Sequence, residues 1–278
     1  MVNSLPRLND WIDCGIDHWS RVRFADQKFQ FQAQSKTDRL LDFADACAIT
    51  AEQIYHQQTH QPLYLSLSGG VDSELVANTL WHLKIPFVPV IASIADINQE
   101  EKWYAEYWCH MRDIVPMRIT IDIATVETFW GRYLAMLRYS HQCGIAVILY
   151  IADQVHQLGG RLLTGLGDVN LCYPGFYCNI VDFCLDYFRP GQHPPGFFMA
   201  TADMAAAYIN AFDMNLDEQY NKVKLFSVSP RPKMNYVADL RTLSSKIEKI
   251  SAIHATSVID SAAHQWSSKQ EVINSFYG

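Results

Sequence analysis

Two hydrophobic periods alternate along the middle of the chain. Four short apolar, β-prone runs predict buried strands: 63–67, 87–92, 118–123 and 161–164. Between them, apolar positions recur at helical spacing and predict four helices: from about 72 to before Pro86, from 98 onward, over 125–139 and over 144–158. Strands and helices that alternate in this way are typical of a parallel sheet with helices on both faces.

The helix that follows the second strand has a recognisable start. Asn98 is a residue type that often caps a helix, and Glu101 stands three residues later. This spacing predicts a capping box, in which each side chain binds the main-chain N–H of the other residue. The same helix is expected to carry four large side chains on one face: Trp103, Tyr107, Trp108 and Met111.

The flanking sequence has weaker patterns. Val22 and Phe24, then Phe29 and Phe31, alternate with polar residues on either side of 25–28 and predict a short hairpin. Three further helices and one strand are predicted from periodicity: helices over 38–56, 199–212 and 239–254, and a strand over 223–228.

These elements predict three segments and an α/β fold class. Residues 1–60 are expected to form an N-terminal extension of hairpin and helix. Residues 61–230 are expected to form the main domain, a parallel five-stranded sheet with helices on both faces. Residues 231–278 are expected to add C-terminal helices that pack on this core.

Composition and charge narrow the class of protein. The 278 residues are 49% hydrophobic and 18% charged, which suits one large globular α/β domain with a sizeable core. The formal net charge is −7. Most nucleic-acid binders have an overall positive field, so we do not expect RNA or DNA as the main substrate.

The sequence also predicts a cytoplasmic location. Residues 1–7 have neither the basic start nor the apolar run of a signal peptide, and no apolar stretch is long enough to span a membrane. Seven cysteines, an odd number without a secretion signal, indicate reduced thiols. Cys172, Cys178 and Cys184 lack the close pairs of metal sites and are interpreted as small buried thiols.

One loop carries the clearest chemistry. Ser68-Gly69-Gly70-Val71-Asp72-Ser73 lies between the first strand of the sheet and a helix. Two glycines let the main chain turn sharply and bring N–H groups to a ligand, and the N-terminus of a helix favours an anion. Ser68 and Ser73 supply hydroxyl donors, and the Asp72 carboxylate is placed to hold Mg²⁺. The loop therefore predicts a phosphate site, without the Gly-Lys-Ser/Thr ending of a Walker A motif.

These six residues resemble the signature of the PP-loop ATP pyrophosphatases, the N-type of the adenine nucleotide alpha hydrolase-like proteins. Members of that family adenylate a substrate oxygen, release pyrophosphate, and let a nitrogen or sulfur nucleophile displace AMP. The resemblance implies ATP and Mg²⁺ as cofactors, held by the loop and by Asp72. It also implies that adenine lies at the end of the second strand, at Ile91, Ala92 and Ser93.

A second turn follows the fourth predicted strand. Thr164-Gly165-Leu166-Gly167-Asp168 is similar to the strand-then-Gly-Glu-Gly turn in the synthetase domain of asparagine synthetase. The carboxyl ends of parallel strands face one crevice, so this turn is expected near the same ATP. The resemblance implies that Gly165 and Gly167 bind the nucleotide and that Asp168 is a second metal ligand. Leu166 replaces an acidic residue of that family, so either the substrate differs from aspartate or the turn has been rebuilt.

A basic segment beyond the core supplies further candidates. Pro230 and Pro232 stiffen the chain around Arg231 and Lys233. Basic residues in this part of the superfamily often meet the phosphates, so we expect Arg231 and Lys233 to be catalytic together with Asp72. A basic surface loop is the alternative interpretation, with Lys222 and Lys224 as reserve candidates.

The leading hypothesis is an asparagine-synthetase-like ligase that forms carbon–nitrogen bonds and releases AMP and pyrophosphate. Val2 stands where the related enzymes have the cysteine of a glutaminase domain, and only about 60 residues precede the loop. Ammonia, an amine substrate or a separate glutaminase partner would therefore supply the nitrogen to a small-molecule substrate, and a homo-oligomer is also left open. Two alternatives remain: a PP-loop sulfurtransferase or RNA-base-modifying enzyme, and an ATP-binding module with reduced catalysis.

Overall fold

The computed structural model describes residues 12–16, 29–33, 40–57, 60–94, 98–122, 125, 143–166, 169–172, 175–178, 193–194 and 196–211. Contacts divide the chain into two compact units. The first consists of 1–59, 166–221 and 259–278, and the second of 60–165 and 222–258. The predicted phosphate loop lies in the second unit.

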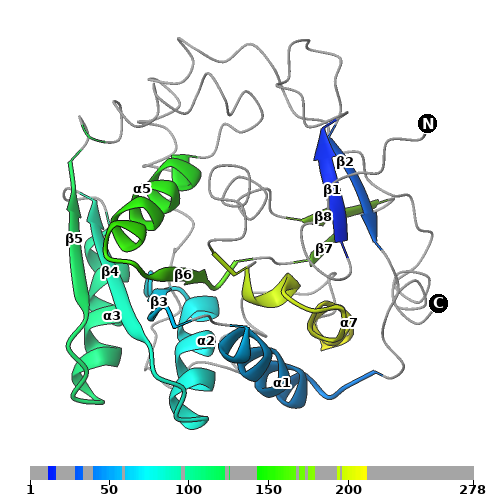
Figure 1. Cartoon of the computed structure of the whole chain (residues 1–278), viewed down its shortest axis with the longest axis horizontal. Helices are drawn as coiled ribbons and strands as arrows, with labels where there is room; N and C mark the ends of the chain where they lie inside the picture. The colour runs from blue at the N-terminus through cyan, green and yellow to red at the C-terminus, as the bar shows by residue number, and fades with distance from the viewer. Residues whose placement is uncertain are drawn as a thin grey trace. The chain divides into compact units, whose positions relative to one another are not determined.

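The second unit contains a parallel sheet (Figure 1). Its four described strands are β3 (Leu63–Ser66), β4 (Val88–Ile94), β5 (Met117–Ile121) and β6 (Arg161–Thr164). The strand order is β5-β4-β3-β6, and every neighbouring pair is parallel. The predicted α/β class is therefore confirmed. The fifth strand predicted over 223–228 lies outside the described residues.

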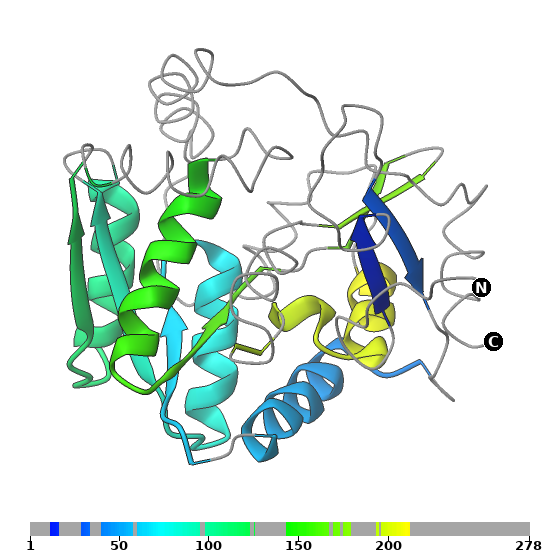
Figure 2. The same cartoon turned by 45° about the horizontal axis from the view of Figure 1, so that its top comes forward.

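Helices cover both faces of this sheet, as predicted. They are α2 (Val71–His82), α3 (Gln99–His110) and α5 (Cys143–Gln157). The chain moves from β3 through α2 to β4 and through α3 to β5, and then returns through α5 to β6 on the other side of β3. Right-handed crossovers place α2 and α3 on one face and α5 on the other, as Figure 2 shows. The helix predicted over 125–139 lies outside the described residues except for Thr125.

The core of the second unit lies on both faces of the sheet because both are covered. Leu63, Leu65 and Leu67 are at most 2% exposed on one face of β3, while Tyr64 and Ser66 are half-buried on the other. All four residues of β6 are buried. Gly160 lies just before β6, and a Cβ there would overlap the ring of Tyr64, so glycine is needed for this close packing.

A polar network joins α2 to α3. The indole N–H of Trp108 donates to Asn78 Oδ1 at 2.8 Å, and Arg112 Nη2 donates to the same oxygen at 3.0 Å. The guanidinium of Arg112 also lies 4.3 Å from the centre of the Trp108 ring, and burial lowers the pKa of Arg112. These contacts fix α3 relative to the helix that carries the phosphate loop.

The predicted shared face on α3 is wrong for Trp108. Trp108 is 2% exposed, whereas Trp103 and Met111 are 53% and 60% exposed. Five residues separate Trp103 from Trp108, a net rotation of about 140° around the helix, so the two cannot lie on one side. Trp103 stacks instead on Tyr107, with ring centres 5.2 Å apart.

The first unit combines two small antiparallel pairs with helices. Strands β1 (Ile12–Ile16) and β2 (Phe29–Ala33) pair, as do β7 (Val169–Cys172) and β8 (Gly175–Cys178). The helices are α1 (Phe43–His56), the short 3₁₀ helix η2 (Phe197–Met199) and α7 (Ala202–Ala211). α1 packs on α7, where the hydroxyls of Thr50 and Thr201, which precedes α7, lie 3.0 Å apart.

The predicted hairpin is described for one of its two strands. β2 includes the predicted 29–31 and pairs with β1 in the register Ile12 to Ala33. This pair spans a longer connection than the tight local turn that the alternation at 22–31 predicts. Residues 22–24 lie outside the described residues, as does the helix predicted over 239–254.

The helices predicted over 38–56 and 199–212 are present with shorter bounds. Asp42 caps α1, because its carboxylate accepts from the N–H of Ala44 at 2.9 Å. The segment limits at 60 and 230 remain predictions; the second unit starts at His60, and residues 166–221 group with the N-terminal part. None of the described helices combines the length and the apolar character needed to cross a bilayer.

Candidate functional site

The candidate site lies at the carboxyl ends of the parallel strands. The predicted phosphate loop follows β3, the residues predicted to contact adenine end β4, and Gly165 follows β6. Since β3 pairs with both β4 and β6, these three strand ends lie at one edge of the sheet. This edge is where open α/β sheets bind ligands.

Hydrogen bonds within the loop fix its shape. The hydroxyls of Ser68 and Ser73 lie 3.1 Å apart, and the N–H of Gly70 donates to Ser68 Oγ at 3.2 Å. Ser73 Oγ also donates to the carbonyl of Gly70 at 2.9 Å. The two serines predicted to bind phosphate therefore also close the loop on itself.

Gly69 is required by both conformation and space. Its φ of +88° lies in the region that residues with a Cβ rarely adopt. A Cβ at Gly69 would overlap the main-chain carbonyl of Glu101, in the first turn of α3. The loop therefore leads directly into α2 and packs against the first turn of α3.

The first turn of α2 completes the loop. Gly70 is the N-cap residue of α2. Because glycine has no side chain, Gly70 makes no side-chain hydrogen bond to the N–H groups at the start of the helix. Asp72 and Glu74 lie in this turn, and the Oδ1 atom of Asp72 is buried. The arrangement can accept an anion at the helix N-terminus and offers the carboxylate of Asp72 beside it.

The turn after β6 packs directly against this helix. A Cβ at Gly165 would lie 2.8 Å from both the N and the Cα of Ser73, closer than real Cβ contacts. Gly165 therefore lies beside the loop, as the sequence predicts for the two turns. Gly167 and Asp168 lie outside the described residues, so their predicted roles remain predictions.

Thr164 is a site candidate that sequence reasoning did not single out. Its side chain is 2% exposed, and Oγ1 has no hydrogen-bond partner among the described residues. It is the last residue of β6, in register with Ser66 of β3, so both side chains point to the same face. Buried hydroxyls are normally hydrogen-bonded. The sequence signal that could have identified Thr164 is a polar residue at the end of an apolar strand.

Asn98 does not cap α3 in the predicted way. Its Oδ1 accepts from the N–H of Ile94, and its Nδ2 donates to the carbonyl of Ala92, each at 2.8 Å. No side-chain bond from Asn98 to the start of α3 forms. Asn98 is the N-cap residue of α3, but the half of the capping box that its side chain should supply is wrong, because the end of β4 uses both polar atoms of that side chain.

The predicted adenine residues lie at this same strand end. Ile91 is buried, whereas Ala92 and Ser93 are partly exposed. Their role in binding a base remains a prediction.

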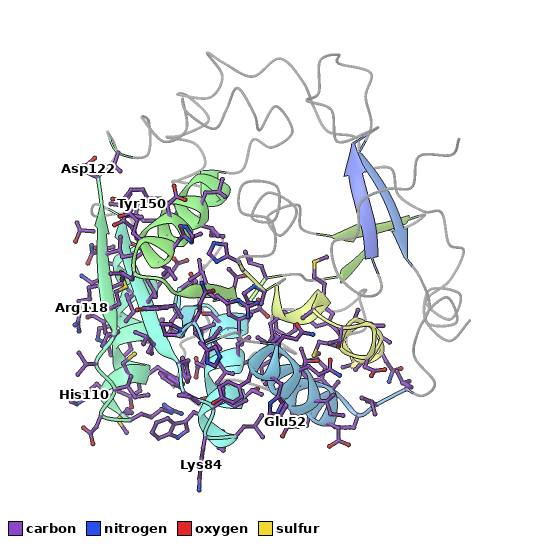
Figure 3. The ribbon with its side chains drawn as sticks, viewed as in Figure 1. Glu52, Lys84, His110, Arg118, Asp122 and Tyr150 are labelled. Carbon is purple, nitrogen blue, oxygen red and sulfur yellow. The ribbon has the colours of Figure 1, made fainter. Side chains whose placement is uncertain are left out.

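Two of the described basic side chains lie away from the candidate site, and Cys47 and Cys109 are buried. Lys84 and His110 lie at the end of the sheet opposite to Asp122, which follows the carboxyl end of β5 (Figure 3). Arg231, Lys233, Lys222 and Lys224 lie outside the described residues. Burial raises the pKa of the Cys47 thiol to about 12 and that of the Cys109 thiol to about 11. In the described part of the chain, no three His, Cys, Asp or Glu side chains gather as a metal site.

Comparisons with known proteins give matches only among solved structures. No protein-family model and no curated protein matches the sequence. The NH3-dependent NAD synthetase from Campylobacter jejuni subsp. jejuni NCTC 11168 is 15% identical over 85% of this chain and 94% of its own, with a TM-score of 0.38. The NMN synthetase from Francisella tularensis is 13% identical over 76% of this chain and 94% of its own, with a TM-score of 0.37.

A third similar structure is the U34-tRNA thiolase NcsA from Methanococcus maripaludis. It is 13% identical over 84% of this chain and 77% of its own, with a TM-score of 0.35. At these low TM-scores the similarities establish neither the fold nor the function of this chain.

Proposed function

We propose that this chain binds ATP at the Ser68–Ser73 loop and cleaves it between the α and β phosphates. The observation that carries this proposal is the close packing around the loop. Gly69 has a positive φ against Glu101, Gly165 abuts Ser73, and the N-terminus of α2 starts at Gly70. Because Gly69 and Gly165 have no Cβ, main chain packs directly on main chain on two sides of the loop, which suits a loop held in one shape to bind phosphates with its N–H groups.

Magnesium fits this set of residues. Mg²⁺ in nucleotide sites is held by one or two carboxylates and by the phosphates, and needs no dedicated protein cage. Asp72, with a buried carboxylate oxygen in the first turn of α2, would hold the metal, with Asp168 as a second ligand. When bound, the ion would offset the negative charge of the triphosphate.

The proposed reaction has two steps. A substrate oxygen attacks the α-phosphorus, the bond from that phosphorus to the bridging oxygen breaks, and pyrophosphate leaves with the electron pair. A nitrogen nucleophile then displaces AMP from the adenylate. The loop positions the phosphates, and Arg231 and Lys233 stabilise the developing charge, so positioning and electrostatics supply most of the rate.

Within this chemistry we favour a cytoplasmic, asparagine-synthetase-like ligase without its own glutaminase domain. The turn from Thr164 to Asp168 supports this branch, and Gly165 lies beside Ser73. Leu166 in place of an acidic residue supports a substrate other than aspartate. Ammonia, an amine or a glutaminase partner would supply the nitrogen.

The test is release of AMP and pyrophosphate from ATP, together with ATP–pyrophosphate exchange, across a panel of carboxylic acids, amines and RNA. Asp72→Asn should abolish exchange while the protein remains folded. Asp113→Asn is the matched control, since Asp113 is exposed in the turn after α3 and has a φ of +52°, which asparagine tolerates. Exchange retained in Asp72→Asn would remove Asp72 from the mechanism. ATP binding without AMP formation across the panel would favour the module with reduced catalysis.

A further inference from the structure

The hydrogen-bond ladder between β3 and β4 ends just before the phosphate loop. The N–H of Leu67 donates to the carbonyl of Val90 at 2.9 Å, and from Ser68 onward the chain turns away into the loop. The main-chain N–H and C=O groups of every second residue in a strand point to the same neighbouring strand. Those of Ala92 and Ile94 therefore point to the same side as the carbonyl of Val90, toward β3. Beyond Leu67, β3 no longer supplies partners for them.

The side chain of Asn98 replaces the missing strand. A carboxamide offers one acceptor and one donor side by side, like a peptide unit. Asn98 Oδ1 accepts from Ile94 and Nδ2 donates to Ala92, each at 2.8 Å. The ladder on β4 is thereby extended by one step with a side chain from the start of α3.

The same residue sets the position of α3 against the loop. The carbonyl of Asn98 accepts from the N–H of Lys102 at 2.9 Å and so begins the helix. Within this first turn, the carbonyl of Glu101 occupies the space that a Cβ on Gly69 would need. A continuous set of contacts therefore runs from the end of β4 through Asn98 and Glu101 to Gly69.

We propose that Asn98 is a positioning residue of the nucleotide site. It holds the end of β4 in strand geometry where the base is expected, and it keeps the first turn of α3 against Gly69, which maintains the loop at a φ of +88°. The proposal rests on the proposed function, because it assumes that the loop binds ATP.

The experiment measures the affinity for Mg²⁺·ATP by calorimetry in Asn98→Ala and Asn98→Asp between pH 8 and pH 5. Asn98→Ala should bind about tenfold more weakly at every pH, the effect of losing one or two hydrogen bonds. Asn98→Asp should bind as weakly at pH 8, since a carboxylate accepts from Ile94 but repels the carbonyl of Ala92. Its affinity should recover toward pH 5.

The affinity of Asn98→Asp for Mg²⁺·ATP should recover at low pH because the carbonyl of Ala92 needs a hydrogen-bond donor. Only a protonated carboxyl group can donate to that carbonyl, so the pKa of the carboxyl group that Asn98→Asp introduces should rise above the ordinary value of about 3.9. Charged residues in the first turns of α2 and α3 (Asp72, Glu74, Glu100, Glu101 and Lys102) are common to the unaltered protein and to both Asn98 variants, and the end of β4 carries none. The unaltered protein, measured at each pH, corrects for their titration and for that of ATP.

Gln99→Glu is the charge-matched control, because it places a carboxylate one residue away and should keep nearly full affinity. Circular dichroism and melting temperature verify folding of each variant at each pH. Unchanged affinity for Mg²⁺·ATP in Asn98→Ala, with or without a lower melting temperature, overturns the inference and leaves the proposed function intact. Folded Asn98→Asp that does not recover at pH 5 also overturns it. Failure of the unaltered protein to bind ATP removes the proposed function and the inference with it.

Discussion

The neighbouring strands β3 and β4 end in opposite ways at the same edge of the sheet. At the end of β3, two glycines and two serines form a loop whose side chains bind one another, and the N-terminus of α2 follows without a side-chain cap from Gly70. At the end of β4, Asn98 satisfies the main-chain groups of Ala92 and Ile94. The start of α2 at one strand end has no side-chain cap from Gly70, whereas the other strand end is closed by the side chain of Asn98.

In the proposed ATP site, this difference would separate two tasks. Phosphates need main-chain N–H groups that are close, correctly aimed and free to bind an anion. A flat apolar base packs well on a rigid surface that has no unpaired polar groups. Because Asn98 hydrogen-bonds the main-chain groups at the end of β4, this strand end can provide such a surface. Variants at the closely packed positions around the loop can separate these contributions.

The largest effect is expected from Gly69→Ala. The φ of +88° disfavours alanine, and its Cβ would overlap the carbonyl of Glu101, so both the loop and α3 must move. The free energy of unfolding should fall by about 2–4 kcal/mol, and ATP binding should be lost. Gly159→Ala is the control, because Gly159 has a φ of +72° with no heavy atom within 4 Å of the added Cβ. It should cost about 1 kcal/mol and leave binding unchanged; similar effects of the two variants would contradict the packing argument.

Gly165→Ala should come next. Its Cβ would press on the main chain of Ser73 from 2.8 Å, which should destabilise the fold by about 1–3 kcal/mol and raise the KM for ATP. Gly160→Ala also adds a Cβ without space, but against the ring of Tyr64 at the other end of β6. Chemical denaturation and steady-state kinetics together should show lost stability in both and a raised KM in Gly165→Ala alone. A normal KM in Gly165→Ala would remove the turn after β6 from the site.

Ser73→Ala should have a smaller effect on the loop. It removes the bonds from Ser73 to Ser68 and Gly70, so stability should fall by about 1 kcal/mol and the affinity for ATP by about fivefold or more. Thr79→Val removes a hydroxyl from α2 further along the helix, where it donates to the carbonyl of Leu75 at 3.0 Å. Binding assays on both should find an affinity loss only in Ser73→Ala, and equal affinities would show that the loop hydroxyls are structural.

The smallest effect on stability is expected from Thr164→Val. Its buried Oγ1 has no partner among the described residues, so replacing it with a methyl group should leave the free energy of unfolding unchanged or raise it by up to about 1 kcal/mol. Thr50→Val removes a hydroxyl that is paired with Thr201, and should destabilise by about 1–3 kcal/mol. If Thr164 meets the ligand, its variant should also bind ATP several-fold more weakly. Equal destabilisation of the two variants would show that Thr164 has a structural partner.

Periodicity was sufficient to predict the sheet of the second unit. Predicted runs correspond to β3, β4, β5 and β6 within one or two residues, and the helices between them to α2, α3 and α5. These elements are buried on regular faces, so their hydrophobic period survives in the sequence. The pairing of β2 with β1 and the hairpin of β7 and β8 were not predicted, because strands of four or five residues leave partner and register open.

The sequence by itself placed the Ser68–Ser73 loop between a strand and a helix, because the apolar runs on both sides of its two glycines have clear periods. It did not determine what Asn98 does. Local spacing indicated a helix cap, which satisfies one N–H at a helix end. The folded structure instead placed Asn98 beside two main-chain groups at the end of β4 that β3 no longer serves. Two hydrogen bonds to such groups outweigh one cap, and only the tertiary structure brings those groups within reach.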